Sequence, residues 1–258
     1  MTRSSGRLSH APVVYALCEI RFSAVLKMAE YLPAIQEALR AKYPRFRHES
    51  MNTIEFALPT AGLTQRSESR WILNDADERN GYLIRQAAIV CHTTGYTDFG
   101  EFLERTLDGI QEVAKAASIA IVERVGLRYI DFIAPESGED ASTYLHAGLA
   151  GMSLQPLGFQ QEAMQLLSSA RTDAGRFVLK VFGGIHTQVV PGDLHPVTLK
   201  TRAPQPDRQT ILLDSDHFTE DGFSYELKRL ESVIRQLHAP ISQVFHAAIT
   251  EHARNKWK

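Results

Sequence analysis

Two long segments of the chain carry apolar residues at the spacing of an amphipathic helix. In residues 96–117, apolar side chains recur on one face, and a threonine and an aspartate at the start can cap the first turn. Residues 221–237 repeat this pattern, and Pro240 is predicted to kink or restart the helix. A shorter stripe in residues 31–44 predicts a third helix. Each stripe needs a surface to cover, so the helices are expected to pack on a sheet.

Much of the remaining chain is rich in β-branched and aromatic residues, in runs bounded by turn signals. These runs predict strands over residues 13–22, 52–59, 69–75, 81–94, 119–133, 159–171, 175–185 and 209–218. Residues 141–152 predict a weak short helix. Residues 186–209 have no periodicity and are expected to form a long loop, with one edge strand at 195–201.

The predicted elements occur in the same order twice, once in residues 1–118 and once in residues 119–258. The first strands of the two halves also match in sequence at three positions: Leu17 with Leu127, Ile20 with Ile130 and Phe22 with Phe132. We therefore predict an internal duplication that folds as one compact α+β domain. Its curved, largely antiparallel sheet would carry the long helices on one face, with the two first strands near a pseudo-two-fold axis. This order of elements resembles the TATA-binding-protein-like and helix-grip folds.

Two opposite charges interrupt the first predicted strand. Glu19 and Arg21 lie on one side of the otherwise apolar run CEIRF. The alignment of the two halves matches Arg21 with Asp131, and these two residues are expected to pair across neighbouring strands. Glu19 is expected to reach Arg128 or Arg124. Two interpretations stay open: a structural charge network at the centre of the sheet, or the polar floor of a binding groove on its uncovered face.

Two aromatic residues complete the set of candidate binding residues. Trp71 and Tyr129 either belong to the core or stack on the bases of a nucleic acid bound to the open face. The candidate binding residues are Glu19, Arg21, Trp71, Arg128, Tyr129 and Asp131.

The sequence contains no linear signature of a known catalytic site. It lacks a phosphate-binding glycine loop, a G-x-S-x-G nucleophile motif, an H-E-x-x-H motif and a paired C-x-x-C. Cys91 and His92 are adjacent, so on a strand their side chains point to opposite faces. Asp214 and Asp216 share one side of a strand end, as metal-binding carboxylates or a polar strand terminus would. The interpretation we favour has no catalytic residue, no metal and no cofactor, and leaves enzymatic activity open.

Composition narrows the class of partner. The net charge of −2 creates no global field that would attract nucleic acid or an anionic membrane. Cys18 and Cys91 lie in apolar runs and are expected to be reduced core residues. The first residues lack the apolar run of a signal peptide, and no stretch is apolar enough for a membrane helix, so a cytoplasmic location is expected.

Four stretches together resemble a sporadically distributed prokaryotic family of proteins of about 260 residues. They are APVVYALCEIRF, HTTGYTDFGEFLE, RVGLRYIDFI and LHAPISQVFHAAIT. The most specific part is the GLRYI core, which family members usually continue with Asn, whereas this chain has Asp131. Members have no established activity, so the resemblance implies no reaction. Sporadic distribution is typical of genes that travel with mobile elements, including defence and toxin–antitoxin loci.

These observations favour a non-catalytic interaction or sensor protein, a possible component of such a defence locus, whose partner is another protein. The alternatives are a module that binds a small apolar ligand between sheet and helices, and a nucleic-acid-binding protein that uses the open sheet face.

Overall fold

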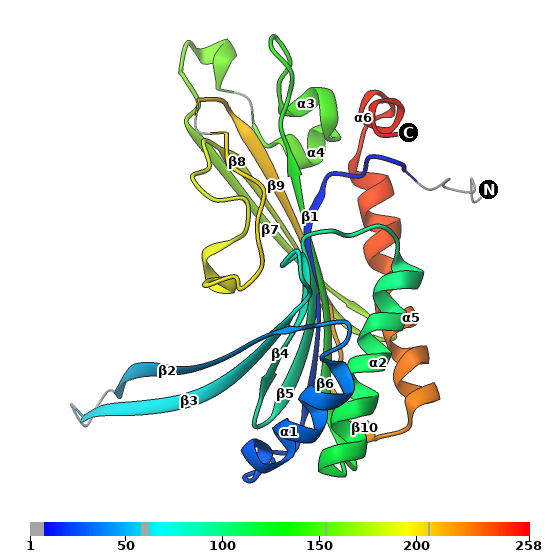
Figure 1. Ribbon diagram of the computed structural model, residues 1–258. Helices are drawn as coiled ribbons and strands as arrows, with labels where there is room; N and C mark the ends of the chain where they lie inside the picture. Colours follow the sequence, from blue (N-terminus) through cyan, green and yellow to red (C-terminus); the bar gives the residue numbers. More distant parts are fainter. Residues whose placement is uncertain (1–7, 58–61, 153, 206) are drawn as a thin grey trace.

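One antiparallel sheet organises the computed structural model, which describes residues 8–57, 62–152, 154–205 and 207–258 (Figure 1). Within these residues the sheet has ten strands, and nine of them follow the order β2-β3-β4-β5-β1-β6-β9-β8-β7. The strands are β1 (Val13–Phe22), β2 (Arg45–Ala57), β3 (Gly62–Asn74), β4 (Asn80–Arg85), β5 (Ala88–Thr93), β6 (Ile121–Ile133), β7 (Ala163–Thr172), β8 (Gly175–Gly184), β9 (Thr210–Phe218) and β10 (Phe223–Ser224). The short β10 pairs with the start of β6.

The helices lie on one face of this sheet (Figure 1). They are α1 (Met28–Leu39), α2 (Phe99–Ala117), α3 (Ala141–Tyr144), α4 (Ala147–Ala150), α5 (Leu227–Ala248) and α6 (Glu251–Lys256). Asp98 caps α2, because its side chain accepts a hydrogen bond from the Glu101 amide at 3.0 Å. The buried stripes of α2 and α5 pack on β5, β6 and β9 and form the main hydrophobic core.

The central strands β1 and β6 are antiparallel neighbours, as predicted. Alternate residues of β1 face the helices, where Ala16, Cys18, Ile20 and Phe22 are buried. Both cysteines are buried and free, and the expectation of core cysteines is confirmed. The α+β class and the largely antiparallel sheet are confirmed as well. The internal duplication stays a prediction.

The loop 185–209 covers part of the other face. Val189, Val190 and Leu199 from this loop form a second, smaller core with residues of β1, β6 and β9. The prediction of an edge strand at 195–201 is wrong, because these residues form no strand. They contact the sheet through isolated hydrogen bonds. One of them joins the Asn74 amide to the Thr198 carbonyl oxygen at 2.8 Å.

Of the two predictions for Pro240, the restart of the helix is wrong, and the helix continues beyond Pro240 as predicted. α5 continues through Pro240 to Ala248, and the next helix, α6, begins after Thr250. A proline removes one helical hydrogen bond, but Leu237 and Ile241 on either side are buried against the sheet. This packing holds the backbone helical across the proline, because tertiary burial contributes more than the single lost bond.

Candidate functional site

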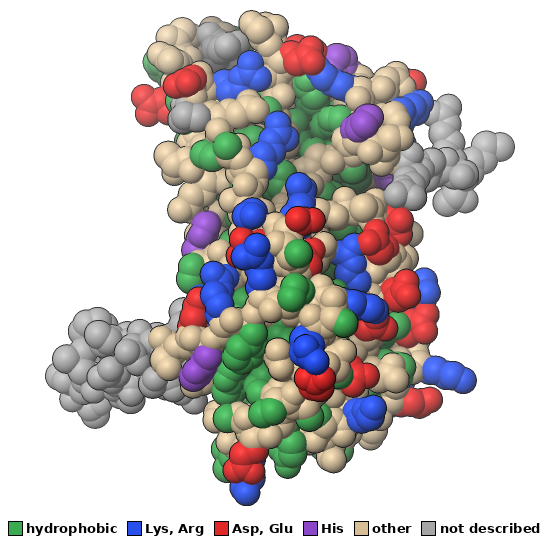
Figure 2. Space-filling model, viewed as in Figure 1, with side chains coloured by type: hydrophobic (Ala, Val, Ile, Leu, Met, Phe, Trp, Pro, Cys, Tyr) green, Lys and Arg blue, Asp and Glu red, His purple; other side chains and the backbone are tan. Residues whose placement is uncertain are grey.

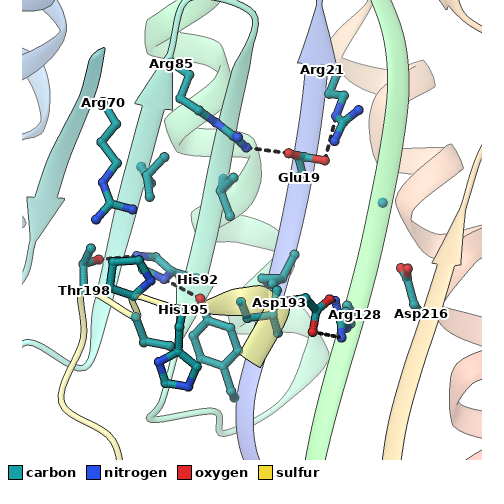
Figure 3. A pocket seen from close by; sticks show the side chains of 18 of the residues that line it. Glu19, Arg21, Arg70, Arg85, His92, Arg128, Asp193, His195, Thr198 and Asp216 are labelled. Carbon is teal, nitrogen blue, oxygen red and sulfur yellow. Dashed lines mark hydrogen bonds and ion pairs between the residues drawn. The ribbon is translucent and has the colours of Figure 1, made fainter. Parts of the chain in front are cut away.

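A groove on the face opposite α2 and α5 is the strongest candidate site. It has a volume of about 450 Å³, and its walls are the central strands on one side and the loop 185–209 on the other (Figure 3). The sheet contributes Tyr15, Leu17, Glu19, Arg21, Arg70, Leu83, Arg85, Val90, His92, Arg124, Gly126, Arg128 and Asp216, and the loop contributes residues 193–198. Figure 2 shows Lys and Arg side chains gathered among acidic ones across the middle of the molecule.

Glu19 is the hub of the polar part of the groove. Its carboxylate accepts hydrogen bonds from Arg85 Nη2 at 2.6 Å and from Arg21 Nε at 2.8 Å. Arg124 Nη1 reaches the same carboxylate at 3.2 Å from β6. The Glu19 side chain is only 12% exposed, and these three guanidinium groups supply its hydrogen bonds. The strand pattern explains the convergence, because all four residues face the same side of neighbouring strands.

Arg128 joins the sheet to the loop. Its Nε and Nη2 donate to the two carboxylate oxygens of Asp214 on β9, at 2.8 and 2.7 Å. Its Nη1 donates to Asp193 in the loop at 2.7 Å. Burial alone would lower the pKa of Arg128, but the hydrogen bonds to Asp214 and Asp193 raise it above its ordinary value. Arg128 also lowers the pKa of Asp193, so this pair stays charged and fixes the loop on the sheet.

His92 lies at the buried bottom of the groove. One ring nitrogen, Nδ1, is 2.8 Å from the Tyr15 hydroxyl, and the other, Nε2, is 3.4 Å from the Thr198 hydroxyl. Burial, with a smaller effect of the Arg70 charge, lowers the pKa of His92 to about 3. The imidazole is therefore neutral at physiological pH and adds no charge to the groove. Cys91 faces the helices instead, as the alternation of strand residues predicted.

The sequence-predicted residues divide between the two faces. Glu19, Arg21 and Arg128 line the groove. Trp71 and Tyr129 belong to the core on the helix side, and base stacking on the open face is therefore excluded for both. The Tyr129 ring meets Tyr96 edge to face, with ring centroids 5.2 Å apart.

Asp131 also lies on the helix-covered face, opposite Val13 of β1 and Leu213 of β9. It is 2% exposed, and its Oδ1 has no hydrogen-bond partner among the described residues. Burial, with a smaller effect of the Asp214 charge, raises the pKa of Asp131 to about 8. This carboxyl group therefore stays largely protonated in the folded protein at neutral pH.

The predicted Arg21–Asp131 pair is wrong. Arg21 lies opposite Arg124 and Asp131 lies opposite Val13, so the two residues are at distant points of the β1–β6 ladder. When two strands run antiparallel, residues that match in the alignment of the two halves lie opposite each other only at the middle of the strand pair. Toward the strand ends, matched residues lie progressively farther apart. The predicted contact from Glu19 to Arg124 is confirmed, whereas Arg128 contacts Asp193 and Asp214 instead.

Sequence reasoning missed Arg70, Arg85 and Asp193 and interpreted Asp214 differently. The signal for the two arginines was the strand alternation, because Arg70 and Arg85 alternate with buried Trp71 and Ile84. Asp193 gave no signal, since it lies in an aperiodic loop. Asp214 lies inside β9 and not at a strand terminus.

The described part of the chain contains no group of three or more His, Cys, Asp or Glu side chains placed to hold a metal ion. No helix among those residues has the length and apolar character needed to span a lipid bilayer.

A scan of the chain against protein-family models gave no match, and a search of curated proteins found none that is significantly similar. The resemblance to a sporadically distributed family stays a prediction.

Proposed function

We propose that this chain is a non-catalytic interaction or sensor protein that recognises its partner through the groove on the open sheet face. One observation carries the proposal: five arginines converge on a groove of about 450 Å³, in a chain whose net charge is −2. A protein with this overall charge has no general attraction for anions, so a local concentration of guanidinium groups favours recognition of one particular anionic surface.

Two groove residues suited to proton transfer, Glu19 and His92, are already engaged with other side chains. Glu19 receives hydrogen bonds from three arginines. His92 is buried at the bottom, next to Tyr15 and Thr198. A general base needs access to a substrate proton at hydrogen-bond distance, and neither group offers it in this arrangement. This supports binding over catalysis.

The two alternatives have weaker support. An apolar ligand between sheet and helices would compete with the large core that occupies that interface. A nucleic acid on the open face would lack stacking partners at Trp71 and Tyr129, which lie on the other face. The element order β1 to α2 and β6 to α5 supports the proposed duplication, and the link to a defence locus rests on the family resemblance alone.

The test is capture of partners from host cells with tagged wild-type protein and two matched variants. Arg85→Gln removes one groove guanidinium, and Arg235→Gln removes an arginine that bonds to Glu231 on the exposed side of α5. Thermal melts first establish that both variants fold.

We expect one stoichiometric partner that binds the wild type and Arg235→Gln and is lost with Arg85→Gln. A partner that binds folded Arg85→Gln as well as the wild type would show that the groove is not the recognition site.

A further inference from the structure

The groove has a charged end and an apolar end. Arg85 and Arg21 lie on either side of Glu19 (Figure 3), and Arg124 bonds to the same carboxylate. Arg70 lies farther away, and its guanidinium bonds to Glu49. Leu17, Leu83 and Val90 form the adjoining sheet surface, and Pro196 and Val197 of the loop face the same space. A ligand that fits both ends carries an anionic group attached to an apolar or heterocyclic body.

The lining residues carry more positive than negative charge. Around Glu19, three arginines (Arg21, Arg85 and Arg124) share one carboxylate. Arg70 is instead paired with Glu49, and Arg128 with Asp193 and Asp214. The imidazole of His92 is neutral. The surplus of two charges is close to the charge of a phosphate monoester at neutral pH, about −1.5 to −2. A carboxylate carries one charge and neutralises only half of this surplus.

The arginines also retain hydrogen-bonding capacity. Arg85 Nε is buried and has no acceptor in the described part of the chain. Arg21 reaches Glu19 through Nε, and 53% of its side chain is exposed. A guanidinium presents a planar fork of donors that matches the oxygens of a phosphate, so neighbouring arginines with remaining donors suit a phosphoryl group.

We infer that the ligand of this groove is a small organic phosphate. Its phosphoryl group lies among Arg85, Arg21 and Arg124, and its body lies on Leu17, Leu83 and Val90. The volume of the groove falls within the roughly 300–1,000 Å³ of ordinary small-molecule sites. The inference deepens the proposed function and rests on it, since it names what the sensor would detect.

Isothermal titration at low ionic strength tests the ligand class with three probes. Phenyl phosphate has the dianion and the body, benzoate has the body with one charge, and inorganic phosphate has no body. We expect phenyl phosphate to bind at least about tenfold tighter than either other probe. Arg85→Gln should weaken phenyl phosphate by about tenfold or more, and Arg235→Gln should leave its affinity unchanged.

Arg21→Gln repeats the test on a more exposed side chain, for the case in which Arg85→Gln does not fold. A fourth titration with AMP identifies the organic body of the ligand. Affinity equal to or above that of phenyl phosphate assigns a nucleobase, and weaker binding assigns a smaller group. Either result is consistent with an organic phosphate as the ligand.

The ligand class is overturned if no probe binds the wild type, if benzoate equals phenyl phosphate, or if the groove variants bind like the wild type. Loss of the captured partner in Arg85→Gln without any phosphate binding would retain the interaction function and reject the ligand. If the wild type binds phosphate but Arg85→Gln still captures the partner, the phosphate ligand would be retained and recognition of the partner through the groove would be rejected.

Discussion

β6 carries one buried arginine and one buried aspartate, Arg128 and Asp131, and they face opposite sides of the sheet. Both are largely hidden from water, with 7% and 2% of their surface exposed. Arg128 faces the groove, where two carboxylates hold its charge. Asp131 faces the helices, where its Oδ1 meets no hydrogen-bond partner among the described residues and its pKa rises to about 8. The partners available on each face, more than burial itself, decide whether a group stays charged.

The largest effect should come from Arg128→Ala. The change leaves Asp214, which is 1% exposed, without its two hydrogen bonds from the guanidinium, and breaking such a pair costs about 3–5 kcal/mol. Urea unfolding should show this loss beside Arg176→Ala, a control that breaks an exposed pair with Glu220 on the same sheet. The double variant Arg128→Met with Asp214→Leu should recover most of the stability, because it removes both members of the buried pair and the remaining Asp193 is 56% exposed. A loss below about 1 kcal/mol in the single variant would contradict the comparison.

Asp131→Asn tests the other face through pH. The pKa of Asp131 is about 8 in the folded protein and 3.8 ordinarily. Between these two pH values the folded state holds a proton that the unfolded state has released. Wild-type stability should therefore fall as pH rises from about 4 to about 8, by up to about 1.4 kcal/mol per pH unit, and Asp131→Asn should lack this loss. Urea unfolding of both proteins at several pH values measures the difference. If the unfolding free energies of the two proteins changed with pH in the same way, Asp131 would not be protonated in the folded protein.

The smallest effect should come from Arg21→Ala. Arg21 is half exposed, and Glu19 keeps its hydrogen bonds from Arg85 and Arg124 after the change. We expect a loss of about 0–1 kcal/mol in unfolding free energy, which shrinks further in high salt. A loss as large as that of Arg128→Ala would mean that Arg21 holds the network together.

The same comparison shows how much the sequence could predict. Local patterns identified α2, α5 and the alternation that places Glu19 and Arg21 together on the open face, since these depend on residues close in the chain. The partners of Arg128 could not be predicted, because Asp193 and Asp214 are 65 and 86 residues away along the chain. A long-range ion pair depends on the register of several strands and on the path of a loop, which no short pattern encodes.

The position of β1 has a consequence for how the protein is made. β1 is near the start of the chain, and Ile20 pairs with Ile89 of β5 on one side and with Val125 of β6 on the other. During synthesis β5 leaves the ribosome before β6, so for that interval one edge of β1 in the nascent chain has no neighbour. Charges on an unpaired edge discourage pairing with other chains, and Glu19 and Arg21 lie on this strand. The charges that line the groove of the finished protein therefore lie on a strand where they would also discourage edge-to-edge pairing of the unfinished one.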